Sequence, residues 1–73
     1  MDLILLKAER IKRGITQEQL AKQLGFKDKS SYCLIENGKT SISIDTANRI
    51  ADYLALSKDL VYKIFFKTNV QET

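Results

Sequence analysis

The chain contains no proline among its 73 residues. Because proline is the residue that interrupts a helix most sharply, long stretches of this sequence can stay helical without a break. Apolar residues also rarely alternate with polar ones in the way that a half-buried strand requires. Together these two features predict an all-α fold.

Capping residues and glycines divide the chain into five expected helices. Thr16 and Gln19 have the spacing of a capping box, and Gly14 and Gly25 each follow an apolar stretch as a helix stop. With their capping residues, the helices are expected at about residues 2–13, 16–24, 28–36, 43–55 and 57–66. Residues 1–66 are therefore expected to form one small domain, and the polar tail 67–73 is expected to fray.

Apolar residues at helical spacing predict which face of each helix is buried. In the first helix Ile4, Ala8 and Ile11 form such a stripe, which continues to Ile15. The inward residues expected in the other helices are Leu20, Ala21, Leu24, Tyr32, Ile35, Ala47, Ile50, Ala51, Leu54, Leu60, Val61, Ile64 and Phe65.

The positive charge of the chain is concentrated in its first part. The net charge is +3, residues 1–40 carry all of that excess, and residues 41–73 are neutral overall. This asymmetry is typical of a chain that presents one side to a polyanion such as DNA.

Several classes of site are not expected. The chain has one cysteine, Cys33, and no histidine, which rules out an intramolecular disulfide framework and argues against a zinc site. Cys33 is expected to be either a small apolar residue or, less favoured, a redox switch. No paired carboxylates converge, so we expect no enzyme, no cofactor and no small-molecule ligand. The longest apolar run, residues 3–6, is too short for a membrane span, and the expected location is a reducing cytoplasm.

Three residues do not fit their immediate surroundings. Glu36 is expected to end the third helix, where its carboxylate faces the negative end of the helix dipole. Leu34 falls on the polar side of the same helix. Arg10 falls on an otherwise apolar side of the first helix and needs a partner if it is buried.

The segments "RIKRGITQEQLAKQLGF", "IENGKT" and "SIDTANRIADYLALS" resemble the lambda-repressor-like, XRE-type family of bacterial and phage regulators. The resemblance covers about residues 3–65. It implies a compact five-helix DNA-binding domain whose second and third helices form a helix-turn-helix. There are two departures from the family pattern. The turn "LGFKD" is one residue longer than usual, and Ala55 stands where a glycine is usual, so the left-handed cap there is expected to be strained or absent.

The resemblance assigns roles to individual residues. It brings the first and third helices together, so Arg10 and Glu36 are expected to form a structural ion pair, the alternative being two separate surface charges. The expected base-reading residues are Lys29, Ser30 and Leu34. The expected phosphate-contacting residues are Gln17, Lys27, Ser31, Asn37, Lys39 and Thr40. Leu34 could contact a thymine methyl group or be an ordinary surface leucine.

The function implied is that of a sequence-specific, double-stranded DNA-binding transcriptional regulator. It is expected to bind a two-fold operator as a homodimer and to act by occupancy alone, with repression favoured over activation. Tyr62, Phe66 and Val70 are the expected dimer contacts, unless Phe66 folds back onto its own domain. The alternative function is an antitoxin-like or adaptor helix-turn-helix module whose main partner is another protein.

Overall fold

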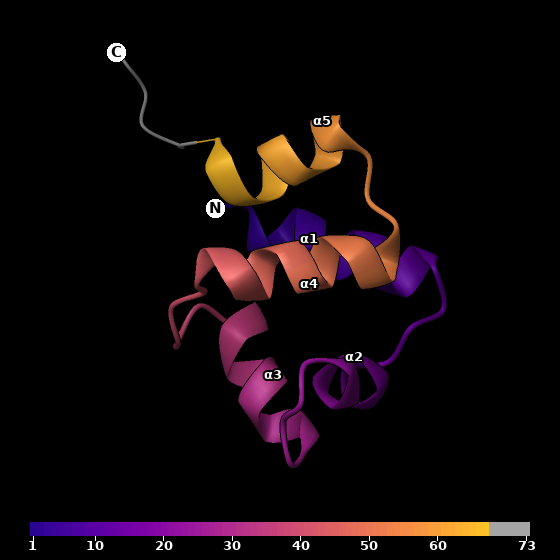
Figure 1. Cartoon of the computed structure of the whole chain (residues 1–73), viewed down its shortest axis with the longest axis vertical. Helices are drawn as coiled ribbons and strands as arrows, with labels where there is room; N and C mark the ends of the chain where they lie inside the picture. Colours follow the sequence, from indigo (N-terminus) through magenta and orange to yellow (C-terminus); the bar gives the residue numbers. More distant parts are fainter. Residues whose placement is uncertain (68–73) are drawn as a thin grey trace.

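The structure, a computed structural model, describes residues 1–67, and its regular elements there are all helical (Figure 1). The helices are α1 (Leu3–Lys12), α2 (Gln17–Gln23), α3 (Lys29–Glu36), α4 (Ile44–Leu54) and α5 (Lys58–Val61), and α5 passes directly into a π-helical turn, η1 (Tyr62–Phe66). The all-α prediction is confirmed. Val70 and most of the expected tail lie outside the described residues.

The predicted capping residues begin the helices. At α2 the capping box is complete: the Gln19 amide donates to the Thr16 hydroxyl at 3.0 Å, and the Thr16 amide donates to the Gln19 side chain at 2.8 Å. Ser43 and Ser57 cap α4 and α5 through their hydroxyls. The Asp28 carboxylate accepts from the Ser30 amide at 2.9 Å and begins α3. These starts depend on local sequence, which is why they could be predicted.

The helices are arranged along the longest axis of the molecule. Figure 1 shows α2 and α3 at one end, α5 at the other, and α1 and α4 between them. The largest fully buried side chains come from α1, α2, α3, α4 and η1: Tyr32, Leu6, Leu20, Ile50, Leu54 and Ile64. The helix-turn-helix unit and the C-terminal helix are therefore separated by the core.

The predicted buried stripe of the first helix is wrong at Ile4, Ala8 and Ile11, although Ile15 beyond the helix is partly buried against the core. Ile4 is 85% exposed, Ile11 is 56% exposed and Ala8 is also exposed. The buried face of α1 instead contains Leu6, together with two charged residues, Glu9 and Arg10. These charged residues can lie inside because each has an ion-pair partner, so the polar contacts of α1 decide which of its faces meets the core.

The left-handed cap at the end of α4 is present although its residue is not glycine. Ala55 has φ 56° and ψ 46°, and the following Leu56 amide donates to the Ala51 carbonyl at 2.9 Å. An L-residue in this conformation is strained because its Cβ lies too close to the following carbonyl oxygen. The expectation of a strained cap therefore fits this geometry, whereas the alternative of an absent cap is wrong.

We expect Ala55→Gly to raise the free energy of unfolding by about 1 kcal/mol, because glycine adopts the left-handed conformation without steric cost. Urea denaturation followed by circular dichroism measures the change. Ala8→Gly is the control: Ala8 is exposed within α1, so this change should instead lower stability by about 0.5–1 kcal/mol. A neutral or destabilising Ala55→Gly would contradict the assignment of strain.

The fifth helix changes its winding after one turn. The Lys67 amide donates to the Tyr62 carbonyl at 2.7 Å, which is the i→i+5 spacing of a π-helix. Ile64 and Phe65 of this turn are buried, as predicted, while Tyr62 and Phe66 are exposed. The carbonyl of Ile64 accepts from the amide of Asp2 at 2.7 Å, so η1 is tied to the start of α1.

Candidate nucleic-acid interface

The outward face of α3 carries the residues that the sequence singled out for base reading. Lys29 and Ser30 are exposed in its first turn, and Leu34 lies one turn further along with 47% of its surface exposed. Tyr32 and Ile35 face the core and hold the helix in place. The outward face is thus mixed in character, with a cation, a hydroxyl and an aliphatic side chain.

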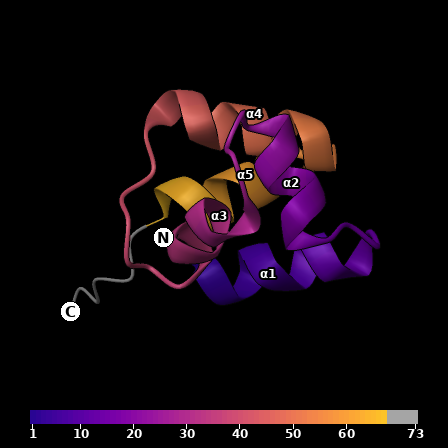
Figure 2. The same cartoon turned by 90° about the horizontal axis from the view of Figure 1, so that it is seen from below.

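The residues expected to contact phosphate lie around α3. Lys27 precedes the helix, while Asn37, Lys39 and Thr40 follow it, and all four are exposed. Ser31 is half-buried within the helix. Figure 2, which views the molecule from below, shows α3 beside α2 and the chain that leads from α3 towards α4. Cations therefore stand at both ends of the exposed face of α3.

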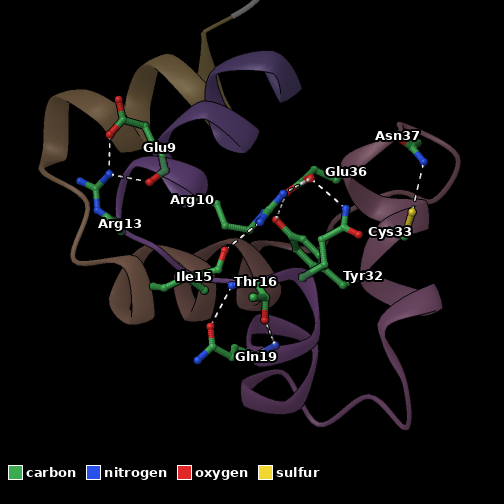
Figure 3. Close-up of polar contacts among 11 residues, drawn as sticks. Glu9, Arg10, Arg13, Ile15, Thr16, Gln19, Tyr32, Cys33, Glu36 and Asn37 are labelled. Carbon is green, nitrogen blue, oxygen red and sulfur yellow. Dashed lines mark hydrogen bonds and ion pairs between the residues drawn. The ribbon is translucent and has the colours of Figure 1, made fainter.

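Behind this face, Arg10 and Glu36 form a bidentate ion pair (Figure 3). The Arg10 Nε donates to Glu36 Oε2 at 2.8 Å, and Nη2 donates to Oε1 at 3.1 Å. Only 8% of the arginine side chain and 2% of the glutamate side chain are exposed. The pair joins the first helix to the end of α3, so the badly placed carboxylate of Glu36 has a cation beside it.

The Glu36 carboxylate also accepts two further hydrogen bonds. The hydroxyl of Tyr32 donates to Oε2 at 2.7 Å, and the side-chain amide of Gln17 donates to Oε1 at 3.0 Å. Arg10 in turn donates to the carbonyl of Ile15 at 2.7 Å. Among the described residues, no buried side-chain nitrogen or oxygen lacks a hydrogen-bond partner. This satisfied network fixes α3 against α1 and α2.

The network shifts the pKa of each of its ionisable members. Burial raises the pKa of the Glu36 carboxyl, but hydrogen bonds from Arg10, Tyr32 and Gln17 outweigh burial and leave the pKa below its usual value. The hydrogen bond to Glu36 raises the pKa of Arg10, and burial raises that of Tyr32. Because the pKa of Glu36 is lower in the folded chain than in the unfolded one, its stabilising effect is present above its usual pKa. That effect is lost as the pH falls through the folded value.

Gln17 is held differently from what its expected role requires. It begins α2, but its amide nitrogen donates to Glu36, and its side chain is half-buried. A phosphate contact through this amide would have to share or replace the bond to Glu36. Asn37, another expected phosphate contact, donates to the Cys33 sulfur at 3.3 Å, and Cys33 itself is half-buried.

Three residues of the framework, Tyr32, Glu9 and Arg13, were not singled out from the sequence for their polar contacts. The Tyr32 hydroxyl, expected only to be buried, is a hydrogen-bond donor to Glu36. Arg13 donates to the Leu54 carbonyl at 2.6 Å and to the carbonyl and carboxylate of Glu9, and this pairing lowers the pKa of Glu9. The spacing of Glu9 and Arg13, four residues apart on one helix, was the available sequence signal for their pairing.

Other kinds of site have no support in the part of the chain that the structure describes. Residues 1–67 contain no group of three or more histidine, cysteine or acidic side chains that could hold a metal ion. None of their helices is both long enough and apolar enough to cross a membrane.

The fold and the exposed α3 define a helix-turn-helix protein. A family model described as "HTH_3: Helix-turn-helix" matches residues 6–61, and the chain belongs to this XRE-type, lambda-repressor-like family. An HTH_3 domain implies DNA binding, and the family is typically non-catalytic. A search of curated proteins found no match to the chain.

Proposed function

We propose that the protein is a sequence-specific transcriptional regulator that binds double-stranded DNA through α3 in the major groove. The observation that carries the proposal is the exposed outer face of α3, with Lys29, Ser30 and Leu34 on it, in a chain that belongs to the HTH_3 family. A DNA partner would place the protein in the compartment that holds the chromosome, which for a bacterial or phage regulator is the cytoplasm.

The side chains on this face have different capacities to read bases. Lys29 can donate to the acceptor groups of guanine, and Ser30 can donate or accept with little selectivity. Leu34 can contact only an apolar group, and the thymine methyl is the apolar group that a base pair offers in the major groove. Leu34 is therefore the residue whose role is easiest to isolate.

The residues around α3 are proposed to set its position on the duplex. Lys27 and Lys39 would neutralise phosphates on either side of the groove, and Ser31, Asn37 and Thr40 would donate hydrogen bonds to phosphate oxygens. Asp28 directly follows Lys27, but its carboxylate is occupied as the N-cap of α3. Gln17 would join them from the start of α2.

The homodimer and the repressor role belong to the same proposal. One recognition helix covers only a few base pairs, so two-fold pairing would double the length of sequence read. Tyr62 and Phe66 remain 56% and 49% exposed, which supports a contact surface there. A dimer bound at a promoter would repress by occupying the site.

Selection of bound duplexes from a random pool tests the proposal directly. We expect an inverted repeat whose half-sites are about 34 Å apart, or a multiple of that distance, on one face of the duplex. Binding should weaken steeply as salt concentration rises, because phosphate contacts release counterions. A pool with no enriched sequence and no salt-dependent shift would overturn it and favour the protein-interaction alternative.

Leu34→Ala and Lys39→Ala should weaken binding in different ways. We expect Leu34→Ala to change base preference mainly at one thymine, with a loss of about 1 kcal/mol or more of binding free energy at that base pair.

Lys39→Ala should weaken binding to all sequences equally and reduce the salt slope by about one unit. Fluorescence anisotropy with the selected site and single-base variants measures both effects. An unaltered motif for Leu34→Ala would mean that the reading face has been placed wrongly.

A further inference from the structure

A second exposed surface lies on α1. Ile4, Ala8 and Ile11 are spaced four and three residues apart, so they line up along one side of the helix. All three are exposed, and Ile4, at 85%, is the most exposed large apolar side chain among the described residues. These three residues are called the α1 stripe below.

The fold of the domain does not use the α1 stripe. The core face of α1, which contains Leu6 and Arg10, lies on the opposite side of the helix. Single apolar side chains on a protein surface are ordinary, but an aligned run over two turns is the pattern of a helix face that packs against another helix. The α1 stripe is therefore a candidate contact surface.

Positive charges border the α1 stripe on both sides. Lys7 lies three residues after Ile4 and four before Ile11, and Lys12 lies four residues after Ala8, so each is a neighbour of the stripe. Both lysines are exposed. A partner that covers the stripe without placing negative charge next to these lysines would therefore bind more weakly.

The acidic groups near α1 do not neutralise these lysines. The Asp2 carboxylate accepts from the Leu5 amide at 2.9 Å, and the Glu9 carboxylate is paired with Arg13 on the buried side. On one flank, Lys7 and Ile11 line an open groove whose far wall includes Glu18 of α2 and Lys29 of α3. At the other edge, Lys12 lies three residues after Glu9, but the Glu9 carboxylate is already paired with Arg13.

We propose that the α1 stripe binds an acidic amphipathic helix of a different protein. The apolar face of that helix would cover Ile4 and Ile11, and its carboxylates would meet Lys7 and Lys12. Ala8, between the two isoleucines, leaves room for the partner helix to approach closely. The proposal goes beyond DNA binding and does not depend on it.

Other occupants fit the α1 stripe less well. A second copy of this chain, paired through α1, would place the lysines of both copies along one contact, where like charges repel. A lipid surface would meet only two large apolar side chains, with no aromatic residue among them. DNA would account for the lysines but not for the isoleucines. An acidic helix accounts for both.

The position of α1 allows such a partner and DNA to be bound together. Figure 2 shows α1 along one edge of the domain, α4 along the opposite edge, and α3 between them. A helix packed on the outer side of α1 would lie beside α3 and would not cover it. Binding of the partner should therefore leave the mobility shift with DNA intact.

The probe for this proposal is a synthetic helical peptide with leucines at every third or fourth position and glutamates on both sides of them. Titrated into the 73-residue chain, it should shift the amide resonances of residues 4–12. Ile4→Ser with Ile11→Ser should weaken its binding by about tenfold or more, because two apolar contacts are lost. Ile44→Ser is the matched control: Ile44 is 69% exposed on α4, and its loss should have no effect.

The second test of the proposal exchanges the charges of the peptide and of the chain. A peptide with lysines in place of the glutamates should not bind the parent chain but should bind Lys7→Glu with Lys12→Glu. DNA binding by the Ile4→Ser, Ile11→Ser variant should equal that of the parent, which separates this proposal from the proposed function and shows that the variant is folded. Three results would overturn it: no binding of the acidic peptide, binding of anionic vesicles instead, or self-association of the chain that the isoleucine changes abolish.

Discussion

Arg10→Met should lower the free energy of unfolding by about 3–5 kcal/mol, because it leaves the Glu36 carboxylate buried without its cation. Glu36 is only 2% exposed in its side chain, so water cannot replace the lost partner without local opening. A loss of this size is a large part of the stability of so small a domain. Urea denaturation at neutral pH measures it.

The double variant Arg10→Met, Glu36→Leu should recover much of this loss, since an apolar pair leaves no buried charge. Recovery should fall short by about 1 kcal/mol, because the Tyr32 hydroxyl and the Gln17 amide lose their acceptor. Arg49→Met is the control: its pair with Asp45 is exposed, and its loss should cost less than about 1 kcal/mol. Equal, small effects of the single and double variants would show that the Arg10–Glu36 pair does not bear on stability.

Much of the fold was predictable because its signals are local. A serine or threonine hydroxyl that accepts from the backbone amide three residues later begins a helix within one turn of chain, and Thr16, Ser43 and Ser57 act in this way. The importance of Arg10 and Glu36 was predictable for a different reason. Each residue is costly where its own helix places it, and that cost points to a partner elsewhere.

The orientation of α1 could not be predicted because its apolar residues lie on two sides. Ile4 and Ile11 offer one possible core face, and Leu6 offers the other. The choice depends on polar contacts with residues far away in the chain, such as the bond from Arg13 to the Leu54 carbonyl. The role of Gln17 depends in the same way on Glu36, nineteen residues later. The amino-acid pattern within a single helix does not indicate contacts of this kind.

The last prediction concerns the exposed aromatic side chains at the other end of the molecule. Phe66 packs edge-on against Phe65, with ring centres 6.5 Å apart, yet 49% of its surface stays exposed. With Tyr62 it lines a groove in which the apolar Leu56 and Val61 lie beside the polar residues Asn48, Asp52 and Lys58. The groove is lined by residues of α4, α5 and η1. Figure 1 shows α5 at the end of the molecule opposite α2 and α3, so pairing through η1 would leave both copies of α3 uncovered.

Phe66→Glu should therefore abolish the proposed dimer and weaken binding to the selected inverted repeat by about 100-fold or more, because two linked half-sites gain roughly 10²–10⁴ in avidity. Binding to a single half-site should change little, since Phe66 is remote from α3. Sedimentation with and without the duplex measures the first effect, and fluorescence anisotropy the second. Ile44→Glu introduces the same charge at an exposed isoleucine of α4 and should leave both unchanged. A parent chain that sediments as a monomer even on the duplex would overturn the proposed dimer, and a Phe66→Glu variant that still dimerises would show that the dimer contact is not at η1.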